Sequence, residues 1–284
     1  MSAAFSERAA RRIANPAAQR VLVALPLGLA ALAIVEPAAR WAAFLVLAVG
    51  FFVLYQRGEL AAWLWAAILP LAVRLALAQA VPEPVSPTNL ADCADLLSPV
   101  AVRRFAETTL VLATLGLLAG LLRADRASLG LRWPSRRIVA LSLVVPLVAV
   151  PLALTVGPTL ARPFFGEYRL ELTLLPAIVP AVVLALANAT LEELLYRGAI
   201  MGWGARLLGP ATALLAQAVL FGLAHGGTDF IDPLGVLPVM VVIGFGGLLA
   251  GIVVQRTGSL LLPLAIHAAL DVPIYYSLAC RLPS

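Results

Sequence analysis

The chain has 284 residues, of which 62% are hydrophobic and only 12% are charged, and its mean hydropathy is +0.99. A soluble protein of this length needs a far more polar surface, so the composition excludes a soluble globular domain and indicates an integral membrane protein. The net charge of +5 comes from 20 arginines, with no lysine, that are scattered between apolar segments. We therefore expect no nucleic-acid partner, and the arginine-only usage is typical of a GC-rich bacterial genome.

Apolar runs along the chain predict membrane-spanning helices, because a span needs about 20 apolar residues. The first two runs are short, so we expect eight or nine spans in an all-α, polytopic transmembrane bundle. The first helix should be retained, because no good signal-peptide cleavage site follows it. The predicted spans are 21–35, 41–55, 60–81, 105–122, 138–160, 181–208, 211–230, 235–254 and 259–279.

The distribution of arginines predicts the orientation, since cytoplasmic loops are enriched in basic residues. Four arginines precede the first span, and five more lie in the loop 123–137. The loop 81–95 is rich in proline and acidic, and should lie on the opposite side. We expect a multi-pass protein of a bacterial inner membrane with a cytoplasmic N-terminus.

Residues that could take part in catalysis or binding are unevenly distributed along the chain. Residues 1–170 contain few, mainly Arg74, which could pair with Glu107 or extend to the interface, and we interpret this region as a transmembrane scaffold. Residues 171–284 contain the rest. An active-site cavity is therefore expected between helices of the C-terminal half.

Two adjacent glutamates interrupt an apolar run in the stretch A-T-L-E-E-L-L-Y-R-G-A. A charge near the bilayer centre costs on the order of 3 kcal/mol, so it persists only if it is paired or functional. Glu193 and Arg197 have the i,i+4 spacing of a helical ion pair. Glu192 points about 100° away, toward the face of Asn188 and Tyr196, and needs a partner from another helix.

The only two histidines lie in apolar segments, His225 in F-G-L-A-H and His267 in H-A-A-L-D. A single buried histidine is more often structural than catalytic. Here both histidines accompany the only Glu-Glu pair, which favours one shared site. His267 and Asp271 share a helix face. At a rise of about 1.5 Å per residue, the predicted spans place Glu192, His225, His267 and Asp271 within roughly 8 Å of the bilayer midplane.

The series E-E-x-x-x-R, F-x-x-x-H and H-x-x-x-(N/D), each on its own predicted span, resembles the CPBP family. This family contains the CAAX proteases and bacteriocin-processing (Abi) enzymes, including the Ras-converting CAAX endopeptidases. The resemblance covers roughly residues 175–280. The matching residues are Glu192, Glu193, Arg197, Phe221, His225, His267 and Asp271.

The resemblance implies a glutamate-dependent intramembrane endopeptidase with its core in residues 171–284. Glu192 would be the general base that activates water, and His225 would hold that water or share its proton. His267 and Asp271 would stabilise the oxyanion of the tetrahedral intermediate. The supporting residues would be Glu193 and Arg197, which fix the helix geometry, together with Phe221, Asn188 and Tyr196.

Asp271 departs from the better-known CAAX enzymes, which have asparagine at this position. An ionised aspartate cannot donate a hydrogen bond to an oxyanion. Either Asp271 is protonated in its buried setting, or it orients His267 and leaves the donation to the imidazole. A simple His–Asp hydrogen bond between packed helices is the structural alternative.

Three other interpretations remain at this stage. Glu192, His225 and His267 are also acceptable Zn²⁺ ligands, although we expect no cofactor. The chain could be a non-catalytic membrane protein, such as a binding or immunity factor, or a proton-coupled transporter. A protease would act on a peptide or membrane-anchored protein within the bilayer. A disulfide between Cys93 and Cys280 is a further possibility.

Overall fold

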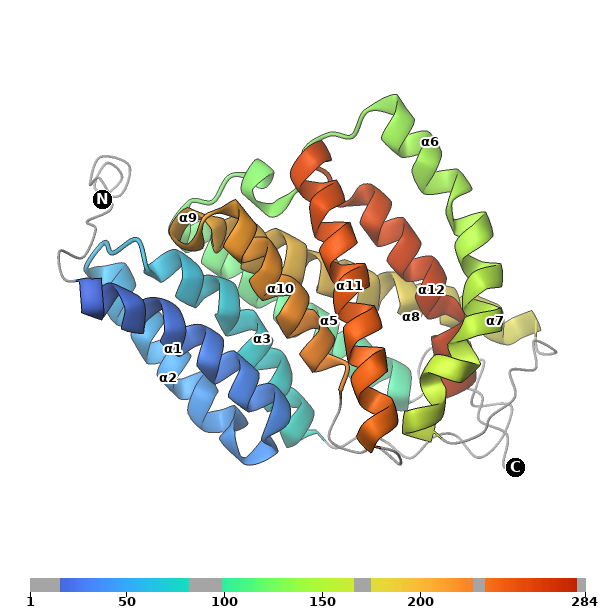
Figure 1. Ribbon diagram of the computed structural model, residues 1–284, viewed down its shortest axis with the longest axis horizontal. Coiled ribbons are helices and arrows are strands. Elements are labelled where there is room, and N and C mark those ends of the chain that lie inside the picture. The colour runs from blue at the N-terminus through green and yellow to red at the C-terminus, as the bar shows by residue number, and fades with distance from the viewer. Residues whose placement is uncertain (1–15, 82–98, 166–174, 227–232, 280–284) are drawn as a thin grey trace.

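The structure, a computed structural model, describes residues 16–81, 99–165, 175–226 and 233–279. These ranges are helical and contain no β-strand, apart from one isolated bridge between Leu131 and Ser259. The predicted all-α bundle is therefore confirmed (Figure 1). The proposed Cys93–Cys280 disulfide lies outside the described residues.

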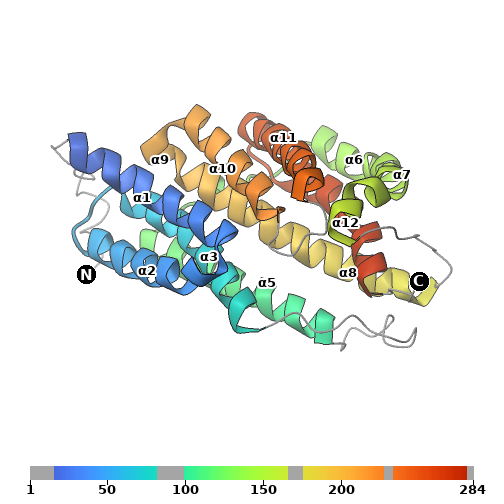
Figure 2. The same ribbon diagram turned by 60° about the horizontal axis from the view of Figure 1, so that its bottom comes forward.

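Three N-terminal helices lie side by side along one flank of the molecule (Figures 1 and 2). They are α1 (Pro16–Val35), α2 (Arg40–Gln56) and α3 (Ala62–Ala80), with the short 3₁₀ turn η1 (Pro37–Ala39) between the first two. The chain breaks before Pro37 because proline disfavours helix in the preceding residue. The first turn of α3 and its middle are almost fully buried, so α3 is the helix that joins this flank to the rest of the bundle.

The middle of the chain forms α5 (Pro99–Leu122), the 3₁₀ turn η2 (Arg126–Leu129), α6 (Arg136–Val144) and α7 (Pro146–Phe165). The predicted span 138–160 is thus helical but interrupted at Val145. Pro146 explains this interruption, because its ring has no N–H and restricts the residue before it.

The predicted span 181–208 is present, but it is not a uniform α-helix. It consists of α8 (Leu175–Glu192), the π-helical segment η3 (Glu193–Trp203) and the short α9 (Ala205–Leu208). Runs of π-helix are rare and occur frequently at functional sites. The change from α to π geometry falls between the two adjacent glutamates, and most of η3 is buried.

Three helices complete the chain: α10 (Pro210–Ala224), α11 (Pro233–Thr257) and α12 (Leu261–Ala279). The sequence predicted a longer helix, 211–230, in place of α10. In the structure this helix ends at Ala224, and His225 is its C-cap residue. The end of the predicted span beyond residue 226 lies in a part of the chain that the structure does not describe.

Within the described ranges, seven helical segments are long and apolar enough to cross a membrane. The shorter apolar helices α10 and Leu261–Pro273 coincide with two further predicted spans. Large apolar side chains such as Leu143, Leu147 and Leu234 lie exposed on the outside of the bundle. Such an exterior suits lipid rather than water, and the chain has the character of a multi-pass membrane protein.

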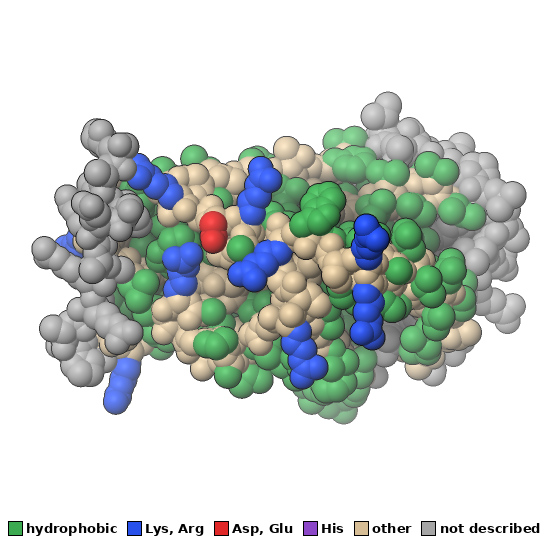
Figure 3. Space-filling view, turned by 90° about the horizontal axis from the view of Figure 1, so that it is seen from above, with side chains coloured by type: hydrophobic (Ala, Val, Ile, Leu, Met, Phe, Trp, Pro, Cys, Tyr) green, Lys and Arg blue, Asp and Glu red, His purple; other side chains and the backbone are tan. Residues whose placement is uncertain are grey.

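The turns at one end of the bundle contact one another and are rich in arginine; we call this the basic end. Figure 3 views it from above and shows many more basic than acidic side chains. The hydrogen bonds that join the turns are Tyr55 Oη to Leu121 O, Trp203 Nε1 to Ser128 Oγ and Arg132 N to Gly258 O. The arginines at the ends of these helices or in the turns include Arg57, Arg123, Arg126, Arg132, Arg206 and Arg256.

The turn η2 packs directly against the π-helical segment η3. Gly198 and Gly202 of η3 face this turn, and an added Cβ at Gly198 would lie 3.2 Å from the carbonyl oxygen of Leu129. At Gly202 an added Cβ would collide with the carbonyl oxygen of Ser128. These glycines therefore allow a backbone loop, rather than another membrane helix, to approach η3.

We predict that Gly202→Ala destabilises the protein, because the backbone of Ser128 cannot rotate away as a side chain could. Overpacking of this kind costs about 1–3 kcal/mol, and thermal unfolding in detergent should show a lower transition temperature. Gly116→Ala in α5 is the matched control, because no heavy atom lies within 4 Å of its added Cβ. A Gly202→Ala protein that unfolds at or above the wild-type temperature would contradict the described packing.

Candidate active site

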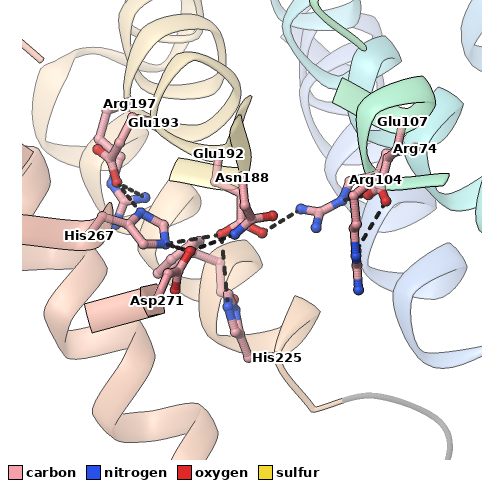
Figure 4. Close-up of polar contacts among 11 residues, drawn as sticks. Arg74, Arg104, Glu107, Asn188, Glu192, Glu193, Arg197, His225, His267 and Asp271 are labelled. Carbon is pink, nitrogen blue, oxygen red and sulfur yellow. Dashed lines mark hydrogen bonds and ion pairs between the residues drawn. The ribbon is translucent and has the colours of Figure 1, made fainter. Parts of the chain in front are cut away.

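Glu192, the last residue of α8, lies at the centre of a buried polar cluster (Figure 4). Its Oε1 accepts a hydrogen bond from Arg74 Nη1 at 2.8 Å. Its Oε2 lies 3.5 Å from His267 Nε2 and 3.9 Å from His225 Nε2. The two oxygens of one carboxylate thus face different partners, an arginine on one side and two imidazoles on the other.

His225 reaches Glu192 from the C-terminal end of α10. Its Nδ1 lies 2.8 Å from the backbone carbonyl oxygen of Phe221. A carbonyl oxygen can only accept, so Nδ1 carries the hydrogen and Nε2 of the neutral ring presents a lone pair. The side chain of His225 is 30% exposed, against 4% for Glu192, which makes the α10 end the more open side of the cluster.

His267 of α12 is held by the second glutamate. Its Nδ1 lies 2.8 Å from Glu193 Oε1, and Arg197 Nη1 lies 3.0 Å from the same oxygen. The predicted i,i+4 ion pair between Glu193 and Arg197 is confirmed. This ion pair connects two turns of one helix, and it also fixes Glu193 Oε1, the oxygen that binds the His267 ring.

Asp271 lies one turn beyond His267, with Oδ2 at 3.6 Å from His267 Nε2, as the i,i+4 spacing predicted. The same oxygen accepts a hydrogen bond from Asn188 Nδ2 at 2.9 Å. Asn188 therefore contacts Asp271, although the sequence placed it only on the face of Glu192. This contact joins α8 to α12 one turn before Glu192.

The ring of Phe221 forms the apolar floor of the cluster. The Arg197 guanidinium lies 4.1 Å from its centroid, and the rings of Tyr196, His225 and His267 meet it edge-on at 5.0, 4.6 and 5.8 Å. Phe221 therefore limits the rotation of both histidines. Tyr196 is fully buried, and its hydroxyl has no hydrogen-bond partner within the described part of the chain.

The contact between Arg74 and Glu192 was not predicted from the sequence. Arg74 Nε binds Glu107 Oε1 at 2.6 Å, which confirms one of its two predicted alternatives, and Arg104 Nη1 binds Glu107 Oε2 at 3.1 Å. A signal was present, because Glu192 lacked a charged partner and Arg74 was the only arginine in its predicted span. No pattern in the sequence indicates that α3 packs against this segment.

The buried Oε2 of Glu192 would be satisfied by a hydrogen-bond donor placed beside the two imidazoles. Glu192 Oε2 has no hydrogen-bond partner among the described residues, and Nε2 of a neutral His225 is an acceptor. A water molecule, with two donor hydrogens, suits such a point. No group of three or more His, Cys, Asp or Glu side chains in the described ranges is arranged to hold a metal ion.

Comparison with known proteins adds an independent observation. The family model described as type II CAAX prenyl endopeptidase Rce1-like matches residues 174–273. Comparison with the curated proteins and with the solved structures gave no match. The matched segment contains both glutamates, both histidines and Asp271, in agreement with the resemblance noted from the motifs. Residues 174–273 are therefore similar to the Rce1-like type II CAAX prenyl endopeptidases, and we call this matched segment the Rce1-like domain.

Proposed function

We propose that the chain is an intramembrane endopeptidase that cleaves a peptide or membrane-anchored protein with water activated by Glu192. The observation that carries this proposal is the division of roles between the two oxygens of Glu192. Arg74 holds Oε1, and Oε2 faces His225 and His267 and has no hydrogen-bond partner in the part of the chain that the structure describes. A general base needs one such oxygen that is free to accept a proton from its water.

In the proposed reaction, water donates one hydrogen to Glu192 Oε2 and its oxygen attacks the scissile carbonyl carbon. The proton passes to Glu192 as the new C–O bond forms. The carbonyl oxygen becomes an oxyanion, and the proton on Glu192 is later delivered to the leaving amine. His225 would hold the attacking water through Nε2, which the Nδ1 contact with Phe221 directs toward the carboxylate.

His267 is the proposed oxyanion donor. Glu192, Glu193 and Asp271 surround its ring at 3.5, 2.8 and 3.6 Å, so a positive charge on this imidazole would be stabilised. Asp271 Oδ2 accepts from Asn188, which favours the orienting role for Asp271 over direct donation. One positioned donor to an oxyanion typically contributes about 10²–10³-fold to the rate.

Only the chemical class of the substrate can be proposed. The matching family model is named for prenylated CAAX substrates, whereas the composition of this chain is typical of a bacterial protein. We therefore propose a peptide precursor or a membrane-anchored tail as the substrate. The arginines of the basic end (Figure 3) support a cytoplasmic location for that end and for the N-terminus, in a bacterial inner membrane.

We predict that Glu192→Gln lowers cleavage of tagged membrane-anchored reporters in cells by about 10²–10⁴-fold, because the amide cannot take a proton from water. His225→Ala should also abolish detectable cleavage. Glu193→Gln should be milder, since it leaves Glu192 and His225 in place. Immunoblots at matched expression measure each ratio of cleaved to intact reporter.

Glu36→Gln is the matched control for these substitutions. Glu36 is exposed and caps the η1 turn between α1 and α2, so the same chemical change there should leave cleavage unaltered. Wild-type cleavage by both the Glu192→Gln and His225→Ala proteins would refute the proposed reaction and favour a non-catalytic binding protein.

A second prediction separates water activated by glutamate from water activated by zinc. We expect purified protein treated with a strong chelator, then freed of it, to cleave the reporter at the untreated rate. The reason is that Arg74 already binds Glu192 Oε1 and compensates the charge of this carboxylate. Loss of cleavage that added Zn²⁺ restores would instead establish the zinc-dependent alternative.

A further inference from the structure

The ion pair between Arg74 and Glu192 connects two parts of the chain that are distant in sequence. Arg74 belongs to α3, outside the Rce1-like domain, and its Nη1 lies 2.8 Å from Glu192 Oε1. Figure 4 shows its guanidinium on one side of Glu192, with His267 and Asp271 on the other side and His225 below. The proposed base is therefore held by a residue that the domain itself does not contain.

The position of Arg74 is fixed by a second acid. Glu107 of α5 binds Arg74 Nε through Oε1 and Arg104 through Oε2, at 2.6 and 3.1 Å. The order of groups is Arg104, Glu107, Arg74 and Glu192, so positive and negative charges alternate along the chain of contacts. Because the Nε contact restricts the last torsions of the Arg74 side chain, the guanidinium presents Nη1 to Glu192 in one orientation.

This pairing matters because Glu192 is almost completely buried, with a side chain that is 4% exposed. A buried carboxylate without a compensating charge takes up a proton instead of remaining ionised. A protonated carboxyl group cannot accept the hydrogen of an attacking water. Removal of the arginine would therefore disable Glu192 as a base, even if every other contact of the site survived.

We infer that Arg74 is a positioning residue that keeps Glu192 ionised and turns Oε2 toward the histidines, with Glu107 as the residue that orients Arg74. This inference rests on the proposed function for its catalytic consequence. The state of the Glu192 carboxyl group, however, can be measured without any substrate.

The first test is infrared difference spectroscopy of the purified protein at neutral pH. Arg74→Gln should gain a C=O stretching band of a protonated carboxyl group that the wild type lacks. The band should be absent from Arg74→Lys, because lysine keeps the positive charge. It should also be absent from the double variant Arg74→Gln with Glu192→Gln, and this absence would assign the band to the Glu192 carboxyl group. Absence of the band from Arg74→Gln would overturn the inference.

The second test uses a membrane-anchored reporter that the wild type cleaves. Arg74→Gln should lower kcat by roughly 10²-fold with KM within a factor of about two, because the loss affects the chemical step and not substrate binding. Arg74→Lys should recover much of kcat. Glu107→Gln should give an intermediate kcat, since Arg74 keeps its charge but loses the contact that orients it.

Arg126→Gln is the matched control, because Arg126 is an exposed arginine of η2 at the basic end. It should leave kcat and the infrared spectrum unchanged. Wild-type kcat in Arg74→Gln, or an equal loss in Arg74→Lys and Arg74→Gln, would overturn the positioning role. If the wild type cleaves no reporter, the proposed function fails, and the carboxyl band still decides whether Arg74 keeps Glu192 ionised.

Discussion

The arrangement of this molecule depends on the cost of placing a carboxylate in a medium of low dielectric constant. Glu192 is tolerated because Arg74 compensates its charge from α3, while the imidazoles of His225 and His267 approach the other oxygen. Helices from both halves of the chain must therefore pack at one point. Helix α3, through Arg74, is part of the electrostatics of the site and not only a support for it.

The local features of the site could be predicted from the sequence, because they depend on spacing within one helix. The i,i+4 relations of Glu193 with Arg197 and of His267 with Asp271 are present in the structure. The all-α architecture followed from composition, and the Rce1-like domain followed from three motifs in order. The supporting position of Phe221 was also anticipated from its motif, although its contacts with both histidines were not.

The features that the sequence did not reveal depend on packing between distant segments. Arg74 and Glu192 are 118 residues apart, and no periodicity links two single charges on different helices. The sequence of η3 did not indicate its π-helical geometry, because its two glycines are compatible with close packing in an ordinary α-helix as well. The early end of α10 at Ala224 was missed for a related reason: F-G-L-A-H-G-G contains glycines, but its apolar residues continue the pattern of a span.

The short α10 has a consequence for the membrane around the protein. Fifteen residues form a helix about 22 Å long, whereas the hydrocarbon core of a bilayer is about 30 Å thick. This negative hydrophobic mismatch favours local thinning of the bilayer beside α10. In a bilayer thinned in this way, His225, at the end of this helix, would lie closer to the membrane surface. The chain length of the surrounding lipids would then set the depth of His225, much as ionic strength sets the range over which a surface charge is felt.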